Sequence, residues 1–125
     1  MELNDISGKI IELAIRVHSE LGPGMLENAY HACLLYEIMD SGLMVESQLK
    51  LPLIYRGKKI DGGYRIDLLV EKVVVVEIKA IDRLLSVHEA QLLSYLRMLD
   101  LRLGLLINFN NRLLRDGIRR VVNNF

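Results

Sequence analysis

The segment Val73 to Ala80 constrains the fold most, because four consecutive valines run directly into Glu77-Ile78-Lys79-Ala80. Consecutive β-branched residues favour an extended strand, and an unbroken apolar run indicates a strand that is buried on both faces. Such strands lie in the middle of sheets that helices cover on both sides. This segment therefore predicts an α/β fold with a central sheet.

The periodicity of the rest of the chain agrees with that fold class. Apolar residues at helical spacing predict helices over 5–21, 25–40 and 84–100, and apolar runs predict strands over 63–70, 73–80 and 103–109. We expect extended chain over 45–55 with a bend at Pro52, a turn over 56–59, and a last strand or hairpin arm over 113–122. A helical crossover would place 103–109 parallel to 73–80. We expect one domain over residues 1–125, an α/β sandwich with a mixed sheet.

Charge and composition exclude several classes of protein. Sixteen basic residues balance sixteen acidic ones, which excludes a protein that binds nucleic acid through a broadly basic surface. Local basic segments nevertheless occur at 56–59 and 112–120. No apolar stretch is long enough for a membrane span, and we expect no signal peptide because the first ten residues carry Glu2 and Asp5 and no apolar block. Because the sequence has a single cysteine, it excludes an internal disulfide and a zinc site with several cysteine ligands. We expect a cytoplasmic protein without a membrane partner.

Charged side chains interrupt the two most apolar predicted strands. Asp67 lies in the first, and Glu77 and Lys79 lie in the second. Burying a charge costs several kcal/mol unless it is paired or holds a metal ion. Glu77 and Lys79 share a face, since side chains two apart on a strand point the same way. Asp67 joins that face if the connecting loop has three or five residues or a bulge, and faces the other way if the turn is only Glu71-Lys72.

On one face, these three side chains would suit phosphodiester hydrolysis. Two carboxylates at cross-strand distance can hold a hard divalent cation, and Mg²⁺ accepts one or two carboxylates together with waters and phosphate oxygens. Lys79 would add a positive charge that stabilises a phosphate in the transition state. The alternative is structural, since a cross-strand pair of Lys with Asp or Glu commonly decorates a strand.

Two predicted helices carry further candidates. Glu27 shares a helix face with Tyr30 and His31, and it is either a third carboxylate or a first-turn glutamate that the helix dipole favours. His88, Gln91 and Tyr95 form one stripe on the helix after Lys79, which could point toward the carboxylates. Alternatively, Tyr95 is a core aromatic and the other two are solvated.

Six motifs then follow one another in a recognisable order. They are Gly24-Met25-Leu26-Glu27-Asn28-Ala29-Tyr30, Glu46-Ser47-Gln48, Asp67-Leu68-Leu69-Val70-Glu71, Glu77-Ile78-Lys79-Ala80, His88-Glu89-Ala90-Gln91-Leu92-Leu93-Ser94-Tyr95-Leu96 and Gly104-Leu105-Leu106-Ile107-Asn108-Phe109. From about residue 6 to 122, the chain resembles the GxxExxY protein family within the PD-(D/E)XK nuclease superfamily. Ile66 stands where the superfamily name has proline.

The resemblance implies a fold and a set of site residues. The fold would be a restriction-endonuclease-like αβββαβ core, with a mixed central sheet flanked by helices, an extra N-terminal helix and a C-terminal strand. Asp67 and Glu77 would be the metal-binding pair and Lys79 the catalytic lysine. Glu27 would match the helical glutamate that joins the site in many members. Gln91 and Tyr95 would match the Gln-x-x-x-Tyr motif of the RecB-like nucleases.

The expected function is Mg²⁺-dependent hydrolysis of DNA, with Mn²⁺ as a substitute metal. A metal-bound water would attack the phosphodiester while Asp67, Glu77 and Glu27 hold the ion, and the Ile78 carbonyl could be a further ligand. The alternative is a catalytically inactive descendant that binds nucleic acid or protein, which zero net charge slightly favours. We expect no nucleotide cofactor, because the sequence contains neither the phosphate-binding loop Gly-x-x-x-x-Gly-Lys-Ser/Thr nor the dinucleotide-binding motif Gly-x-Gly-x-x-Gly. A homodimer through residues 1–20 or 111–125 is a further hypothesis.

Overall fold

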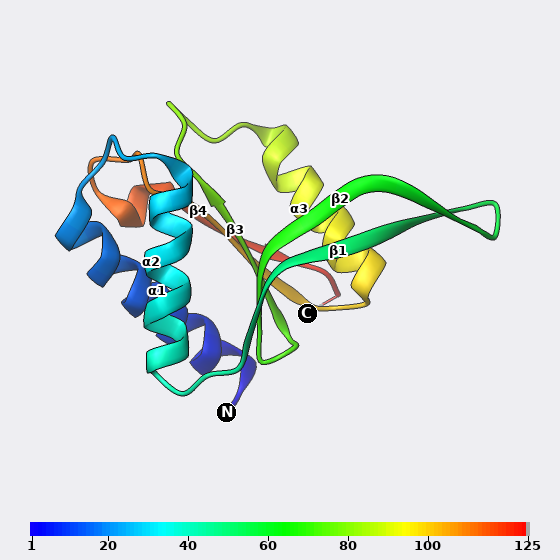
Figure 1. Cartoon of the computed structure of the whole chain (residues 1–125), viewed down its shortest axis with the longest axis horizontal. Coiled ribbons are helices and arrows are strands. Elements are labelled where there is room, and N and C mark those ends of the chain that lie inside the picture. Colours follow the sequence, from blue (N-terminus) through cyan, green and yellow to red (C-terminus); the bar gives the residue numbers. More distant parts are fainter. Residues whose placement is uncertain (125) are drawn as a thin grey trace.

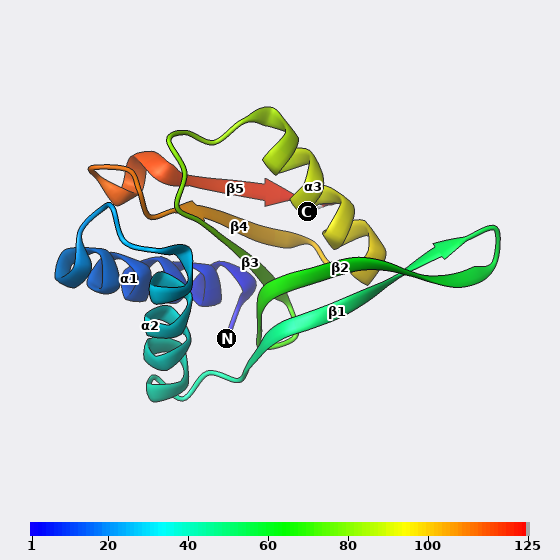
Figure 2. The ribbon, with the colours of Figure 1, turned by 45° about the horizontal axis from the view of Figure 1, so that its top comes forward.

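The computed structural model describes residues 1–124 and contains a five-stranded sheet with helices on both faces (Figures 1 and 2). In chain order the elements are α1 (Leu3–Leu21), α2 (Glu27–Asp40), β1 (Val45–Tyr55), β2 (Lys58–Val70), β3 (Val74–Lys79), α3 (Ser86–Leu99), β4 (Leu103–Asn108), a 3₁₀ turn η1 (Leu114–Gly117) and β5 (Ile118–Val122). None of the helices in this part of the chain is long and apolar enough to span a membrane.

The sheet has the order β1-β2-β3-β4-β5 and is mixed. Strands β3 and β4 are parallel and are joined through α3, whereas the other three neighbouring pairs are antiparallel. This confirms the predicted crossover and the α/β class. The arrangement is consistent with a restriction-endonuclease-like core, to which the additional N-terminal helix and β5 are added.

The alternation of side chains along β3 divides the core into two layers. Val74, Val76 and Ile78 pack under α1 and α2, while Val75 packs in a second cluster under α3. All five residues from Val74 to Ile78 are buried. The valine run therefore forms the doubly covered central strand that its composition predicts.

Two strands begin several residues away from their predicted starts. β2 begins at Lys58 rather than near Gly63, because Arg56 and Gly57, both at positive φ, form a two-residue turn that continues the β1–β2 pairing to Tyr55↔Lys58. The expected strand over 113–122 is shorter, since residues 114–117 form the 3₁₀ turn before β5.

The outer part of the β1–β2 hairpin projects from the body of the protein (Figures 1 and 2). We call residues 50–65 the arm. Every β2 residue from Lys58 to Arg65 is exposed, whereas the rest of β2 is buried or half-buried. The register shifts between Leu51 and Leu53, at the bend predicted for Pro52.

Candidate active site

The β2–β3 hairpin places Asp67 beside Glu77. Its register is Leu68↔Val76, Leu69↔Val75 and Val70↔Val74, so the connecting loop holds three residues, 71–73. A loop of three residues, one of the connections that sets Asp67 and Glu77 on a common face, replaces the two-residue turn that would have separated them. Glu71 and Lys72 both adopt positive φ to make this turn.

The two carboxylates interlock with the opposite backbone. The Asp67 amide donates to Glu77 Oε2 at 2.8 Å, and the Ile78 amide donates to Asp67 Oδ2 at 2.7 Å. The last backbone pair between β2 and β3 is Leu68↔Val76, which lies directly next to Asp67 and Glu77. The carboxylates thus occupy the place of the next ladder hydrogen bonds, and this reciprocal pair fixes both side chains at the point where β2 and β3 separate.

Burial makes the charged form of Glu77 costly. Only 6% of Glu77 is exposed, and Asp67 is half-buried. The pKa of Glu77 is raised to about 8, first by this burial and then by the Asp67 charge, although the Asp67 amide and the Lys79 ammonium lower it. A cation placed between the carboxylates would reverse this balance and favour both charged forms.

Lys79 lies two residues beyond Glu77 on β3 and therefore on the same face. It is half-buried, and its charge acts on Glu77. Neither ion pair found within residues 1–124 includes Lys79. Its ammonium group is consequently available to an anionic substrate.

Ile78 lies between these two residues and is fully buried. Its amide donates toward β2, to Asp67. Since the N–H and C=O of a strand residue point toward the same neighbour, its carbonyl also faces the gap beside Asp67. That orientation is compatible with the ligand role expected for the carbonyl.

The segment Gly24 to Tyr30 fixes the start of α2. Gly24 has φ +94°, a conformation that favours glycine, and the buried Tyr30 hydroxyl donates to the Gly22 carbonyl and accepts from the Met25 amide. Tyr30 also stacks on Phe109 with ring centroids 4.7 Å apart. Gly24 and Tyr30 therefore have structural roles. Glu27 is exposed, makes no hydrogen bond or ion pair with the described residues, and adds its charge to those acting on Glu77.

The stripe on α3 divides into three different environments. His88 Nδ1 accepts the Leu85 amide at 2.9 Å and so caps the helix. Tyr95 is buried, and its pKa is raised to about 12, first by this burial and then by the charge of Glu77. Gln91 is exposed and lines, with Tyr95, a groove between α3 and the arm.

Two groups of polar residues were not predicted. His31 lies between Ser47 and Gln48, with Nε2 3.0 Å from Ser47 Oγ and Nδ1 2.9 Å from Gln48 Nε2. The fully buried Asn108 bonds both the amide and the carbonyl of Ile81, and so holds the segment after Lys79. A polar residue at the end of the apolar β4 was the one available signal for Asn108.

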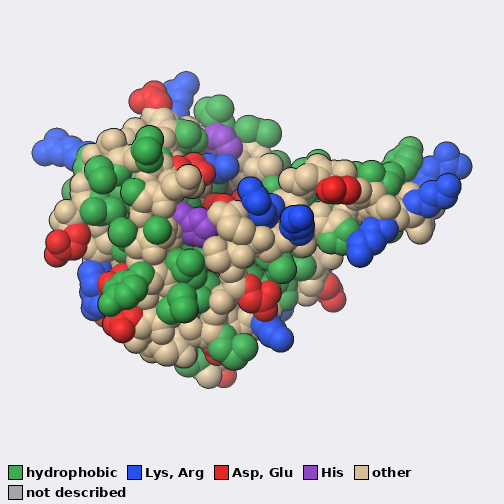
Figure 3. Space-filling model, in the orientation of Figure 1, with side chains coloured by type: hydrophobic (Ala, Val, Ile, Leu, Met, Phe, Trp, Pro, Cys, Tyr) green, Lys and Arg blue, Asp and Glu red, His purple; other side chains and the backbone are tan. Residues whose placement is uncertain are grey.

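The donor set fits a small divalent cation. Asp67 and Glu77 each use one carboxylate oxygen for a backbone amide, and the second oxygens make no hydrogen bond with the described residues. Two carboxylates with water suit Mg²⁺. No group of three or more His, Cys, Asp or Glu side chains in residues 1–124 is arranged to hold a metal, so Glu27 is not part of a preformed three-carboxylate cage. Figure 3 shows acidic, basic and histidine side chains close together on the viewed face of the protein, beside the start of the arm.

Comparisons with known proteins give one match. A family model described as the PD-(D/E)XK nuclease superfamily matches residues 4–121, which is nearly the whole chain. No curated protein and no solved structure gives a significant match.

Proposed function

Because the chain belongs to the PD-(D/E)XK nuclease superfamily, we propose that it is a Mg²⁺-dependent nuclease that hydrolyses phosphodiester bonds of DNA. The observation that carries this proposal is the reciprocal pair of Asp67 and Glu77, with Lys79 on the same face. Burying two neighbouring carboxylates without a cation opposes folding, so a structure that fixes both is best explained by a bound metal.

Each residue has a distinct task in this proposal. Asp67, Glu77 and the Ile78 carbonyl would hold the ion, and Glu27 would supply a further carboxylate from the start of α2. Bound Mg²⁺ would lower the pKa of water and offset the charge of the phosphodiester. Mn²⁺ prefers similar oxygen ligands and should substitute.

Lys79 and Tyr95 act on the phosphate. Lys79 is proposed to stabilise the negative charge that develops on the phosphate oxygens, because its ammonium group is charged and has no ion pair with the described carboxylates. Tyr95 stays protonated at neutral pH, since its pKa is about 12, and it would donate a hydrogen bond. Gln91, exposed at the edge of the groove between α3 and the arm, would position the substrate.

The test is cleavage of supercoiled, linear duplex and single-stranded DNA by the full chain, with Mg²⁺, with Mn²⁺ and with EDTA. We expect metal-dependent cleavage that falls by about a hundredfold to a thousandfold in Asp67→Asn, as when one transition-state-stabilising group is removed. Glu12→Gln on α1 is the matched control, since it removes one exposed carboxylate that has no role in the site, and it should cleave as the wild type does.

Calorimetric titration with Mg²⁺ separates loss of metal from loss of folding. Asp67→Asn should bind Mg²⁺ at least about tenfold more weakly while keeping its circular dichroism spectrum. Full activity in Asp67→Asn would refute the assigned site. DNA binding without cleavage of any form by the wild type would instead favour the non-catalytic module.

A further inference from the structure

Positive charge is concentrated in the arm. Residues 50–65 contain five basic side chains and one acidic side chain, namely Lys50, Arg56, Lys58, Lys59, Arg65 and Asp61. The arm therefore carries a net charge of +4, and because the whole chain is neutral, the remaining residues carry −4. A neutral protein that confines its excess positive charge to one projecting hairpin can bind a polyanion there.

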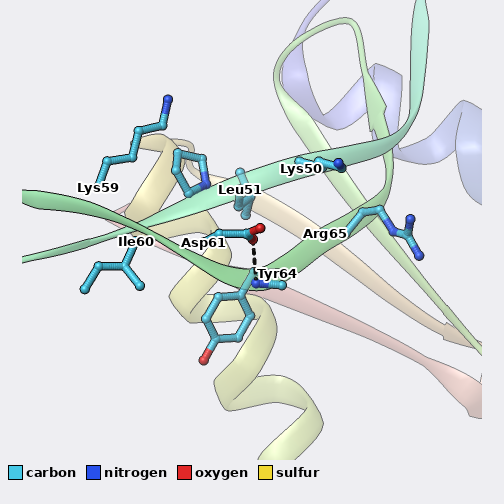
Figure 4. Close-up of a pocket in the computed structure, with 9 residues that line it drawn as sticks. Lys50, Leu51, Lys59, Ile60, Asp61, Tyr64 and Arg65 are labelled. Carbon is cyan, nitrogen blue, oxygen red and sulfur yellow. Dashed lines mark hydrogen bonds between the residues drawn. The ribbon is translucent and has the colours of Figure 1, made fainter.

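The arm has two chemically different faces. Lys50 pairs with Arg65 and Ile54 pairs with Lys59, so by strand alternation three basic side chains lie on one face. The pairs Leu51↔Tyr64 and Leu53↔Ile60 lie on the other face. In Figure 4, Ile60 and Tyr64 point to the opposite side of the ribbon from Lys59.

The charges on the basic face are not neutralised within the described residues. Lys50 and Arg65 lie directly opposite each other, an arrangement that destabilises a hairpin, and neither takes part in an ion pair. Asp61 accepts the Gly63 amide at 3.2 Å, the dashed bond in Figure 4. A groove of about 720 Å³ is lined by the three basic side chains of this face and by Asp61, together with neighbouring arm residues that include Leu51 and Tyr64. An external anion would relieve the repulsion.

The basic face begins beside the candidate active site. Arg65 lies two residues before Asp67 on β2, and Lys50 is the cross-strand partner of Arg65, so both cations lie close to the candidate active site along the strand. Figure 3 shows Lys and Arg side chains along the arm as far as its tip. A chain of phosphates lying on this face would therefore arrive at Asp67.

We propose that the basic face of the arm binds the sugar–phosphate backbone of double-stranded DNA and leads it to the candidate active site. This inference deepens the proposed function and rests on it for the direction of the DNA, but not for the binding itself. A two-stranded ribbon matches the width of the major groove. Proteins that bind single strands stack bases on aromatic rings, whereas Tyr64 lies on the other face and packs edge-on against Tyr95 at 6.1 Å.

The experiment measures binding without cleavage. Fluorescence anisotropy of a labelled 30-base-pair duplex is followed in EDTA between about 50 and 300 mM salt, because each phosphate contact contributes about 0.9 to the slope of log K against log salt. The variant Lys50→Gln/Lys59→Gln/Arg65→Gln should lower that slope by about 2.7 and weaken binding about tenfold or more at 100 mM salt. The control Lys9→Gln/Lys72→Gln/Arg112→Gln removes the same charge from positions outside the arm and should change the slope by less than about 1.

Four outcomes decide the inference. Wild-type slope and affinity in the arm variant would overturn it, as would equal losses in the two triple variants. Tighter binding of a single strand than of the duplex would also overturn it. So would an arm variant that changes the oligomeric state of the protein by light scattering, since the arm would then be a contact between copies.

The proposed function and the inference fail separately. Asp67→Asn should lose cleavage while it keeps the wild-type salt slope. If the protein cleaves DNA and the arm variant binds normally, the inference is wrong and the proposed function stands. If the arm variant loses binding but the wild type cleaves no DNA in Mg²⁺, the inference stands and the proposed function is wrong.

Discussion

Strand β2 passes through two contrasting environments. Its inner end, from Ile66 to Val70, is buried or half-buried and carries Asp67, whereas its outer part, from Lys58 to Arg65, is exposed at every position and carries three cations. The inner carboxylate is fixed by reciprocal backbone hydrogen bonds, and the outer cations have no ion pairs within residues 1–124. One strand thus combines a rigid acidic site with an open basic surface.

The contrast follows from how burial changes electrostatics. Charges in a poorly solvated site interact strongly and are screened little by salt, whereas exposed charges act over about one Debye length and weaken as salt rises. Substitutions at the inner site should therefore change the rate of the chemical step. Substitutions on the arm should change salt-dependent binding.

The largest expected effect is that of Lys79→Met. Loss of the ammonium group should lower kcat for cleavage of a duplex by about a hundredfold to a thousandfold with little change in KM, as when a group acts only in the transition state. Lys59→Met should instead raise KM in a salt-dependent way, and Lys72→Met, in the β2–β3 loop, is the control for charge. Steady-state kinetics at two salt concentrations distinguish these results. A Lys79→Met protein that differs only in KM would erase the contrast between the two regions.

The next effect concerns stability without metal. The pKa of Glu77 is raised to about 8 by burial and by Asp67, so the folded protein binds this proton more tightly than the unfolded chain does. Stability should be greatest below the unfolded pKa and should fall as pH rises through about 8, by up to a few kcal/mol, because one pKa unit corresponds to about 1.4 kcal/mol. Thermal unfolding in EDTA from about pH 5 to 8.5 measures the fall.

Glu77→Gln should flatten this pH dependence, because the amide has no charge to desolvate and retains an oxygen for the Asp67 amide. The control Glu46→Gln removes an exposed carboxylate from β1 and should retain the wild-type pH dependence of stability. Mg²⁺ should also flatten the wild-type curve, since a cation favours the charged carboxylates. An unchanged slope in Glu77→Gln would assign the pH dependence to another group.

The inner site was more predictable from sequence than the arm. A strand of valines that ends in Glu77 and Lys79 signals both burial and a need for charge compensation. Requiring Asp67 on the same face predicted a loop of three or five residues or a bulge, and the structure has the three-residue loop. The start of β2 at Lys58 was not predicted, because residues 58–63 lack apolar alternation and become a strand only by pairing with β1. That pairing is a tertiary effect.

The contacts of His31 illustrate the same limit. Gln48 adopts φ +56°, and both it and Ser47 reach His31. A non-glycine residue in this conformation carries no sequence signal, because the surrounding structure imposes it. Spacing on a helix placed Glu27 and His31 on one face, but it could not place β1 beside them.

A smaller effect is expected for the tyrosine pair between α3 and the arm. Tyr95→Phe should lower kcat about fivefold to tenfold, the loss of one neutral hydrogen bond, because its hydroxyl is proposed to contact the phosphate. Tyr64→Phe keeps the edge-on ring contact and should leave kcat unchanged. Single-turnover cleavage with saturating enzyme measures both. Equal losses in the two variants would indicate that the ring pair acts through packing of the arm rather than through the Tyr95 hydroxyl.

The smallest effect compares the two turns that bound β2. Arg56 at the arm tip has φ +52° and Lys72 in the β2–β3 loop has φ +58°, and such conformations strain residues with a side chain. Lys72→Gly should stabilise the protein by about 0.5 kcal/mol, the relief of strain less the entropy cost of glycine. Arg56→Gly should leave the global free energy of unfolding nearly unchanged, because the exposed arm can open without unfolding the core.

Urea denaturation and amide hydrogen exchange test this difference. Arg56→Gly should slow exchange only of arm amides, and it should lower the DNA salt slope by about 0.9, since it also removes a cation. Lys72→Gly should slow exchange in the buried strands and leave the salt slope as it is. If Arg56→Gly instead raised the global stability as much as Lys72→Gly, the arm would fold as one unit with the core. The independence of the basic surface from the acidic site would then be wrong.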